Sequence, residues 1–406
     1  MQKDRGNDTI MLRKLGLGFL SICVLVAALA IWRADDIRRL LAVNSLFSAE
    51  HIVSNFSSMD TMFHARSVPV SGEVEAWPRN EAPLPEVIAT SGQPLDVQAY
   101  LQSTTTTSLI VILDGAIVHE SYYLGTGEED LRISWSMAKS MLSVAIGVAV
   151  DNGLIDLDRT VDSYVPSLAG SAYEGATVRN VLNMASGVRF NEDYLDFWSD
   201  INKMGRVLAI GGSMDGFAAE VDERDREPGS ARQYISIDTH VAAMVLRAAT
   251  GQDLPDYIGQ TIFSPIGLER EPYYVTDENG VAFALGGMNM TTRDYARFGQ
   301  MVLDGGQWAG VQVVPEEWIE QSTAPSAPTA TRNDGFDYGY QWWIPEGIEG
   351  VILARGVYGQ FIWIDRNTNS VIVKTSGDRN FRQRGAMARA VAFFNGLTTH
   401  YAGRTP

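Results

Sequence analysis

Ser136 and Lys139 stand three residues apart in the apolar stretch ISWSMAKSMLSVAIGVAV, residues 133–150. On a helix, residues at this spacing share one face, with Cβ atoms roughly 5–6 Å apart. Burial in such an apolar helix penalises the ammonium and lowers its pKa. A neutral lysine can take the proton of the neighbouring hydroxyl and make the serine a nucleophile. The spacing therefore predicts nucleophilic chemistry at Ser136.

Two further features bear on this prediction. If Ser136 lies in the first helical turn, the unpaired N–H groups there favour an adjacent oxyanion. Chance matches to so short a motif are expected in a chain of this length, so the spacing alone leaves a coincidence open. Lysine is scarce, however, and occurs only at Lys3, Lys14, Lys139, Lys203 and Lys374. A rare charge in a buried setting favours a functional interpretation.

Other catalytic chemistries lack their motifs. The chain has no Gly-x-Ser-x-Gly elbow, no Walker loop and no dinucleotide-binding glycine loop. Its single cysteine, Cys23, lies in the N-terminal apolar run, which excludes a cysteine nucleophile. Acidic pairs such as Glu128-Glu129 are typical of solvated loops rather than of a glycosidase. The histidines show no metal-ligand spacing and are His51, His64, His119, His240 and His400. We therefore expect no metal and no cofactor.

Composition restricts the class of partner. The 406 residues are 45% hydrophobic and carry a formal net charge of −17. This composition is typical of a globular protein. Nucleic-acid binding requires basic patches, which the sequence lacks, so this class of partner is excluded. The sequence does not determine the oligomeric state.

The N-terminal segment, residues 1–32, has the pattern of a membrane anchor or a signal peptide. An uncharged run over residues 15–32 follows Lys3, Arg5, Arg13 and Lys14. Eighteen residues is about the minimum for a membrane-spanning helix. Residues 28–30 (Ala-Leu-Ala) also fit a signal-peptide cleavage site. We expect either an inner-membrane anchor with a periplasmic catalytic domain or export after cleavage.

The rest of the chain divides into residues 33–94, predicted as a stalk and an extended surface-wrapping segment, and a folded domain over 95–406. Asp114-Gly115 between two β-rich runs predicts a hairpin. Apolar residues recur at helical spacing over about residues 154–345, which predicts mostly helices and loops there, followed by strands and a final helix. Strands at both ends predict an α/β fold with one antiparallel sheet flanked by helices and a mostly helical subdomain inserted in the middle.

These motifs resemble the serine β-lactamase and penicillin-binding-protein superfamily, whose first motif is Ser-x-x-Lys at the start of a central helix. The similarity extends over roughly residues 95–400. It is greatest to the class C-like branch, which includes serine esterases and 6-aminohexanoate-dimer hydrolases. The stretches that carry it are TVRNVLNMASGVRF (177–190), PGSARQYISIDTHVAAMVLRAATG (228–251), FSPIGL (263–268), GGMNMTTRDYARFGQMVLDGG (286–306) and YGYQWWI (338–344).

The resemblance implies catalytic roles for three side chains. Ser136 is the expected nucleophile and Lys139 its activating partner. Tyr234 matches the tyrosine of the Tyr-x-Asn motif, which shares proton transfer to the leaving group. The expected oxyanion hole is formed by the backbone N–H groups of Ser136 and Val357. An ordinary half-buried tyrosine is the alternative for Tyr234.

The expected substrate contacts include two departures from the family pattern. Ser236 stands where asparagine is commoner, and Ala354-Arg355-Gly356 replaces the Lys-Thr-Gly or His-Thr-Gly strand motif. Tyr194 is placed to match a tyrosine that contacts the substrate amide in 6-aminohexanoate-dimer hydrolases. Tyr194, Ser236, Arg355 and Gly356 are therefore the expected substrate-binding residues. Lid packing for Tyr194 and a structural ion pair with an aspartate for Arg355 remain alternatives.

We therefore expect a serine hydrolase that cleaves a linear amide or ester through an acyl-enzyme on Ser136. The alternative is a tethered sensor or binding module that acylates without turnover. Small-molecule substrates and, through the N-terminal segment, the membrane are the expected partners.

Overall fold

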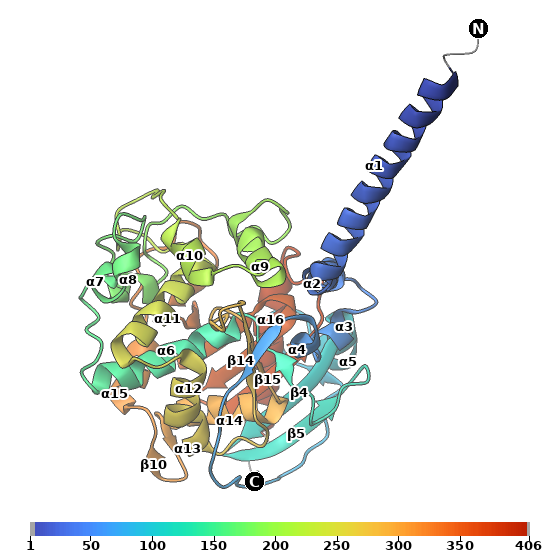
Figure 1. Ribbon diagram of the computed structural model, residues 1–406. Helices are drawn as coiled ribbons and strands as arrows, with labels where there is room; N and C mark the ends of the chain where they lie inside the picture. Colours follow the sequence, from blue (N-terminus) through green and yellow to red (C-terminus); the bar gives the residue numbers. More distant parts are fainter. Residues whose placement is uncertain (1–4, 404–406) are drawn as a thin grey trace.

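The computed structural model describes residues 5–403. Helix α1 (Arg5–Trp32) projects from a single body, and its described apolar side chains between Leu15 and Trp32 are exposed (Figure 1). Among residues 5–403, no helix combines the length and the apolar character that crossing a bilayer requires.

The body is built on the predicted antiparallel sheet. In the described residues its seven strands have the order β11-β12-β13-β14-β15-β4-β5. Their bounds are β4 (Thr106–Leu113), β5 (Ala116–Tyr122), β11 (Phe336–Tyr338), β12 (Trp343–Pro345), β13 (Val351–Gly356), β14 (Gln360–Asp365) and β15 (Ser370–Ser376). Strands from both ends of the domain thus meet where β15 pairs with β4. The hairpin at Asp114 and Gly115 is confirmed: both residues have positive φ, 49° and 75°, as a type I′ turn requires.

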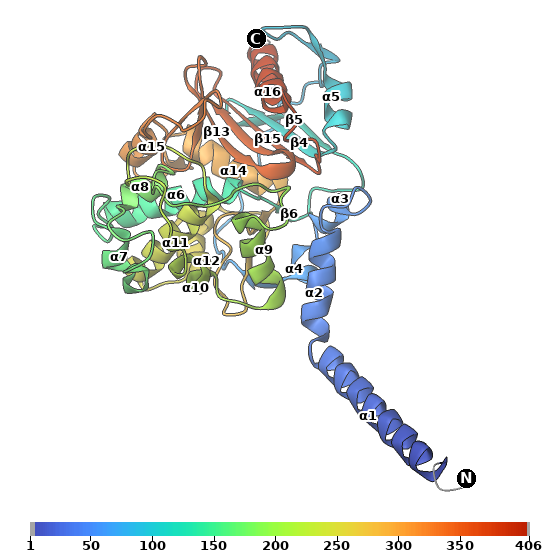
Figure 2. The same ribbon diagram turned by 90° about the horizontal axis from the view of Figure 1, so that it is seen from above.

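Helices cover both faces of this sheet (Figure 2). On one face α5 (Val97–Ser103) and α16 (Ala386–Ala402) form a core in which the rings of Tyr100 and Phe393 stack 4.2 Å apart. On the other face lie α6 (Met137–Asp151) and α14 (Thr292–Leu303), which join the larger core. The buried central helix is confirmed over residues 137–150, and Asn152 and Gly153 follow its end as predicted. Its first four predicted residues are not helical, because Ile133 belongs to a strand and Ser136 is the N-cap.

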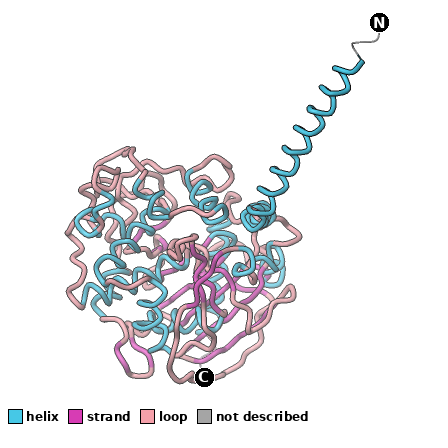
Figure 3. Tube along the Cα trace, in the orientation of Figure 1, coloured by secondary structure: helices cyan, strands magenta, loops and turns pink. Residues whose placement is uncertain are grey.

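The inserted subdomain is mostly helical, as expected, and its loops run over the surface (Figure 3). Its helices are α7 (Val161–Tyr164), α8 (Val178–Leu182), α9 (Asp200–Ile210), α10 (Met214–Ala219), α11 (Ser236–Thr250), α12 (Leu254–Ile258) and α13 (Ser264–Ile266). Helical spacing over 153–166 overestimates the helix there, because only Val161–Tyr164 is helical. Thr160 is extended at its N-cap and Pro166 follows, so the segment is mainly turns.

Part of the predicted stalk belongs to the body. After α2 (Ala34–Ser45), residues 46–68 bury Leu46, Ile52, Phe56, Met59, Phe63 and Val68 in the larger core. Strand β1 (His64–Ser67) pairs with β7 (Tyr273–Thr276) in a second sheet that also contains β8 (Met288–Met290) and β6 (Arg132–Ile133). Residues 46–68 are therefore part of the folded body and not of a stalk. So short a segment shows no periodicity from which this burial could have been predicted.

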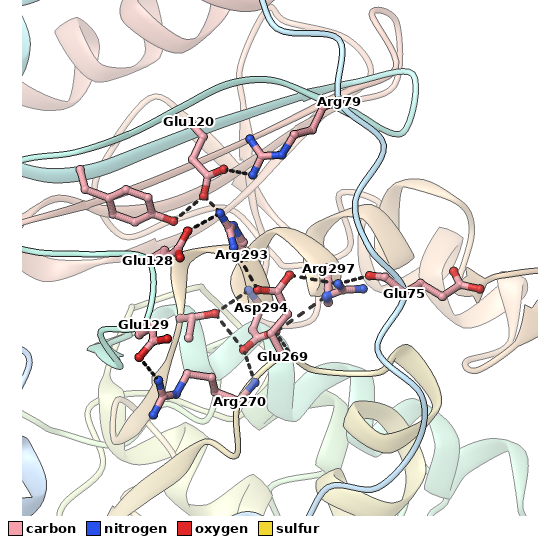
Figure 4. Close-up of polar contacts among 12 residues, drawn as sticks. Glu75, Arg79, Glu120, Glu128, Glu129, Glu269, Arg270, Arg293, Asp294 and Arg297 are labelled. Atoms are coloured by element: carbon pink, nitrogen blue, oxygen red, sulfur yellow. Dashed lines mark hydrogen bonds and ion pairs between the residues drawn. The ribbon is translucent and has the colours of Figure 1, made fainter.

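An ion-pair network fastens the surface-wrapping segment to the sheet (Figure 4). Arg293 on α14 contacts Glu120 on β5 at 2.6 Å, and Arg79 of the wrapping segment reaches the same carboxylate at 2.6 Å. The Glu120 side chain is only 7% exposed. Burial acts to raise its pKa, but hydrogen bonds from Arg293, Tyr122 and Arg79 outweigh burial, and the pKa lies below its ordinary value.

Candidate active site

Ser136 lies at the N-terminus of α6, in a sharply turned backbone. It is the N-cap residue, and Trp135 before it has φ 44°. A bulky residue in the left-handed region is strained by roughly 1–2 kcal/mol, so packing must hold it there. The Trp135 ring packs against Phe56, with ring centroids 5.5 Å apart. The turn leaves Ser136 half-buried at the end of a buried helix.

Lys139 lies in the first turn of α6 and is 1% exposed. Within the described part of the chain, its Nζ has no hydrogen-bond partner. Burial lowers the pKa of the ammonium to about 7, although the charges of Glu192 and Asp238 act to raise it. A lysine with this pKa is partly neutral at physiological pH and can accept a proton.

Tyr234 lies just before α11 and faces this lysine. The Lys139 Nζ is 5.4 Å from the centroid of the Tyr234 ring. Burial and the charge of Glu192 raise the pKa of Tyr234 above its ordinary value. Hydrogen bonding to Ser136 opposes this shift, so the phenol interacts with the expected nucleophile. The structure thus brings Ser136, Lys139 and Tyr234 together.

The end of β13 forms the opposite wall. A Cβ built on Gly356 lies 2.5 Å from the backbone oxygen of Ser134, so only glycine lets the strand approach the loop before Ser136. Val357 follows, and Tyr358 next to it has φ 59°. The residues beside both expected oxyanion donors, Ser136 and Val357, are therefore held in the left-handed region. The oxyanion role itself remains a prediction.

Arg355 does not form the ion pair that was its alternative interpretation. Asp334 pairs with Arg232 at 2.9 Å instead. Among residues 5–403, Arg355 takes part in no ion pair, and its guanidinium lies 4.6 Å from the centroid of the Trp343 ring. Burial lowers its pKa, and the guanidinium borders the same cavity as Ser136. This placement is compatible with binding an acidic or polar substrate group.

Two acidic residues of the site carried no signal in the sequence. The Ser236 N–H donates to Glu192 Oε2 at 2.8 Å, and both the Ser236 hydroxyl and the Tyr194 hydroxyl donate to Glu192 Oε1. Glu192 thus satisfies a free N–H at the start of α11. Asp238 lies in the first turn of α11 and is fully buried. Burial raises its pKa to about 7, although hydrogen bonds from Ser186 and Tyr173 and the charge of Lys139 act to lower it.

Two cavities meet at Ser136. The larger has a volume of 710 Å³ and a polar wall that includes Glu192, Tyr234, Trp343, Arg355, Gly356, Lys374, Asp378, Arg382 and Arg389. The smaller has a volume of 120 Å³ and is lined mainly by apolar side chains. Ser136, Tyr194 and Val357 border both cavities. Ser236 borders only the smaller one. In the part of the chain described, no cluster of His, Cys, Asp and Glu side chains could hold a metal ion.

Residues 96–394 match the family described as Beta-lactamase, which is more than half of the chain. The protein is a member of the β-lactamase family. This β-lactamase-family protein is 32% identical over 293 residues to the 6-aminohexanoate-dimer hydrolase of Paenarthrobacter ureafaciens, covering 69% of this chain and 75% of the relative. It is a serine hydrolase of the amidase and carboxylesterase type, similar to that enzyme.

Solved structures agree on the fold of this β-lactamase-family protein. A Bacillus anthracis protein provisionally described as a 6-aminohexanoate-dimer hydrolase superposes with a TM-score of 0.79 at 24% identity, covering 89% of this chain and 97% of its own. EstCE1, a hydrolase with promiscuous acyltransferase activity, superposes with a TM-score of 0.59 at 13% identity, covering 74% and 97%. At these identities the structures support the expected β-lactamase-like α/β fold.

Proposed function

We propose that this protein hydrolyses a linear amide or ester through a covalent acyl-enzyme on Ser136. The observation that carries the proposal is the buried Lys139, whose ammonium has a pKa of about 7 one helical turn from Ser136. An unpaired lysine inside an apolar helix destabilises the fold. Its presence therefore favours a functional role in proton transfer.

Acylation begins with the neutral Lys139 taking the proton of the Ser136 hydroxyl. The Oγ atom then attacks the carbonyl carbon, and the carbonyl oxygen becomes an oxyanion stabilised by the N–H groups of Ser136 and Val357. Collapse of the tetrahedral intermediate breaks the bond to nitrogen or oxygen. The leaving group takes a proton delivered through Tyr234, whose hydroxyl regains one from Lys139.

Deacylation repeats these steps with water. The neutral Lys139, with Tyr234, takes a proton from a water molecule that attacks the acyl carbon. The second tetrahedral intermediate then releases the carboxylic acid, and Ser136 regains its proton. With the substrate and one water molecule, the side chains of Ser136, Lys139 and Tyr234 account for every proton transferred.

A linear substrate is favoured over a β-lactam. Ala354 stands where the families that this chain resembles carry the lysine or histidine that positions the lactam and its carboxylate, so that cation is missing here. The guanidinium of the next residue, Arg355, lies over the Trp343 ring, 4.6 Å from its centroid. A planar guanidinium in this position is not equivalent to the ammonium of a lysine. The relative from P. ureafaciens is named for a dimer of an amino acid joined end to end, which is a linear amide.

The alternative function is a sensor that acylates without turnover. The departures at Ser236 and Ala354 favour it, whereas the joint presence of Ser136, Lys139 and Tyr234 favours an enzyme. A sensor has no evident need for a lysine of lowered pKa after acylation.

Intact-mass spectrometry of the full chain separates these functions. Seconds after addition of p-nitrophenyl butyrate, the wild type should carry a butyryl adduct that then clears, and Ser136→Ala should carry none. A persistent adduct would identify a sensor. No adduct from any ester or linear amide, with the protein folded, would exclude the hydrolase mechanism.

We also propose that residues 1–32 direct export of the body to the periplasm. The support is the order of basic residues and then an uncharged apolar run in the sequence. N-terminal mass analysis of the protein recovered from the periplasmic and cytoplasmic fractions tests this proposal. Recovery of the intact chain from the cytoplasm alone would contradict it.

A further inference from the structure

The smaller cavity beside Ser136 has an unusual wall. One side is α9, from which Ile201, Asn202, Gly205 and Leu208 face the cavity. These positions follow the spacing of a single helical face. The other side is formed by Val43 at the end of α2 and by the two residues after this helix, Leu46 and Phe47. In the described residues, no charged side chain lines this cavity.

We infer that this cavity, here called the acyl pocket, holds an uncharged aliphatic acyl group of about four to six carbons while it is bonded to Ser136. The inference rests on the proposed acyl-enzyme. It names the class of acyl group that the site accepts, and it assigns part of the selection to residues such as Val43 and Phe47, which lie outside the matched family region 96–394.

The position of Tyr234 decides which half of the substrate enters which cavity. Tyr234 borders the larger cavity and not the acyl pocket. Since Tyr234 delivers the proton to the leaving group, the leaving group lies in the larger, polar cavity. The acyl group stays on Ser136 and must then extend to the other side, into the acyl pocket.

The volume sets the length of the acyl group. An apolar cavity of about 150 Å³ holds a benzene molecule of six carbons. At 120 Å³ the acyl pocket accepts slightly less, so chains beyond about six carbons exceed it. An acyl group ending in an ammonium is disfavoured because the pocket offers no charged partner to a desolvated ion.

Phe47 links the acyl pocket to the catalytic backbone. Its ring stacks on Tyr358 with centroids 4.7 Å apart and lies 5.7 Å from the ring of Trp135. These two aromatic residues flank the expected oxyanion donors and have positive φ. The segment before the family domain therefore closes the acyl pocket and supports the strained turns beside Ser136 and Val357.

Gly205 offers a direct test. It lies inside α9 on the face that lines the acyl pocket, and a Cβ built there meets no atom within 4 Å. Gly205→Phe should fill the pocket without a backbone clash. Gly205→Ala is the matched control, since it adds one methyl group and favours the helix.

The experiment measures kcat/KM of the full-length chain for p-nitrophenyl acetate, butyrate, hexanoate and decanoate. Each buried methylene contributes roughly a fourfold factor, so the kcat/KM of the wild type should be about sixteenfold higher for butyrate than for acetate and should decline at decanoate. Gly205→Phe should abolish the preference, with a much larger loss for butyrate and hexanoate than for acetate. Gly205→Ala adds a single methyl group and should still prefer butyrate to acetate. The ester of 6-aminohexanoate should react at least about tenfold more slowly than that of hexanoate.

Several outcomes would overturn the inference. These are a flat chain-length profile in the wild type, an equal loss for acetate and hexanoate in Gly205→Phe, or a preference for the 6-aminohexanoate ester. If no ester acylates Ser136, the proposed function fails, and the acyl pocket is then tested by ligand binding alone. Sodium hexanoate, and not acetate, should raise the melting temperature of the wild type and leave Gly205→Phe unchanged. No shift in the wild type would reject the pocket.

Discussion

Ser236 donates two hydrogen bonds to one carboxylate, that of Glu192: its N–H at 2.8 Å and its hydroxyl. This contact explains why the chain can depart from asparagine at position 236. An asparagine side chain would have to compete with Glu192 for the space and the hydrogen bonds that the smaller serine now satisfies. The Glu192 carboxylate that Ser236 contacts places a negative charge close to Lys139 and Tyr234.

Replacing Glu192 by glutamine should shift the pH dependence of activity. The Glu192 charge raises the pKa of Lys139 against burial, so its removal lowers that pKa below about 7. Because the neutral lysine is the active form, the acid limb of kcat/KM should move to lower pH by roughly one unit. Profiles from pH 5 to 9 measure the shift. Glu192→Asp keeps the charge and should shift less; a displacement of the limb to higher pH would refute this assignment.

Lys139→Met should lose activity and gain stability. Loss of the proton acceptor should lower kcat/KM by roughly 10²–10⁴-fold. The folded pKa of about 7 lies below the ordinary 10.5, so the unfolded chain binds the extra proton between these values. Wild-type stability therefore rises with pH over this window, and at pH 7 the buried lysine destabilises the fold by a few kcal/mol. Methionine removes that cost.

Urea unfolding of both proteins at pH 7 and pH 9 checks the stability prediction. Lys374 on β15 is the matched comparison, because burial lowers its pKa to about 7 although the charge of Asp378 acts to raise it. Lys374→Met should give a similar increase in the free energy of unfolding. A Lys139→Met protein that is less stable than the wild type at pH 7 would show that Lys139 is a structural residue.

Gly356→Ala should destabilise the site through a backbone clash. The added Cβ would lie 2.5 Å from Ser134 O and 3.1 Å from the Trp135 Cβ. Relieving such overpacking costs roughly 1–3 kcal/mol and moves the turn before Ser136. We expect that loss in urea unfolding and at least a tenfold loss in kcat/KM. Gly205→Ala, which meets no atom, is the control; wild-type behaviour of Gly356→Ala would mean that the strand and loop can separate freely.

Arg293→Met should make the protein more sensitive to acid. The folded pKa of Glu120 is below its ordinary value, so this carboxylate stabilises the fold above its ordinary pKa and loses that contribution as the pH falls. Without Arg293, only Tyr122 and Arg79 oppose the effect of burial on Glu120, so the pKa of this carboxyl rises. We expect a loss of about 3 kcal/mol at pH 7 and an acid unfolding midpoint at higher pH.

Circular dichroism during acid titration measures that midpoint. Arg270→Met is the control, since its pair with Glu129 is exposed and contributes at most about 1 kcal/mol. Equal acid unfolding midpoints for the two variants would show that the contacts of Arg293 in Figure 4 stabilise the fold no more than an exposed ion pair does.

Local patterns in the sequence were sufficient for the elements that position the catalytic groups. The Ser136–Lys139 spacing, the apolar helix behind it and the turn at Asp114-Gly115 are encoded within a few residues, because helical period and turn geometry are short-range properties. The strands of the sheet followed from the same kind of signal, whereas the role expected of Tyr234 followed from the resemblance of several motifs to a known family.

Tertiary structure alone decided the rest of the site. Glu192 meets Ser236 across 44 residues, and Phe47 reaches Tyr358 from outside the matched family region. Arg355 does not pair with Asp334, because Asp334 forms its ion pair with Arg232. Such contacts have no period in the chain, because they arise where separate elements pack together. The sequence thus determined the fold class and predicted the catalytic residues, while the packing of distant segments decided the charge around Lys139 and the shape of the acyl pocket.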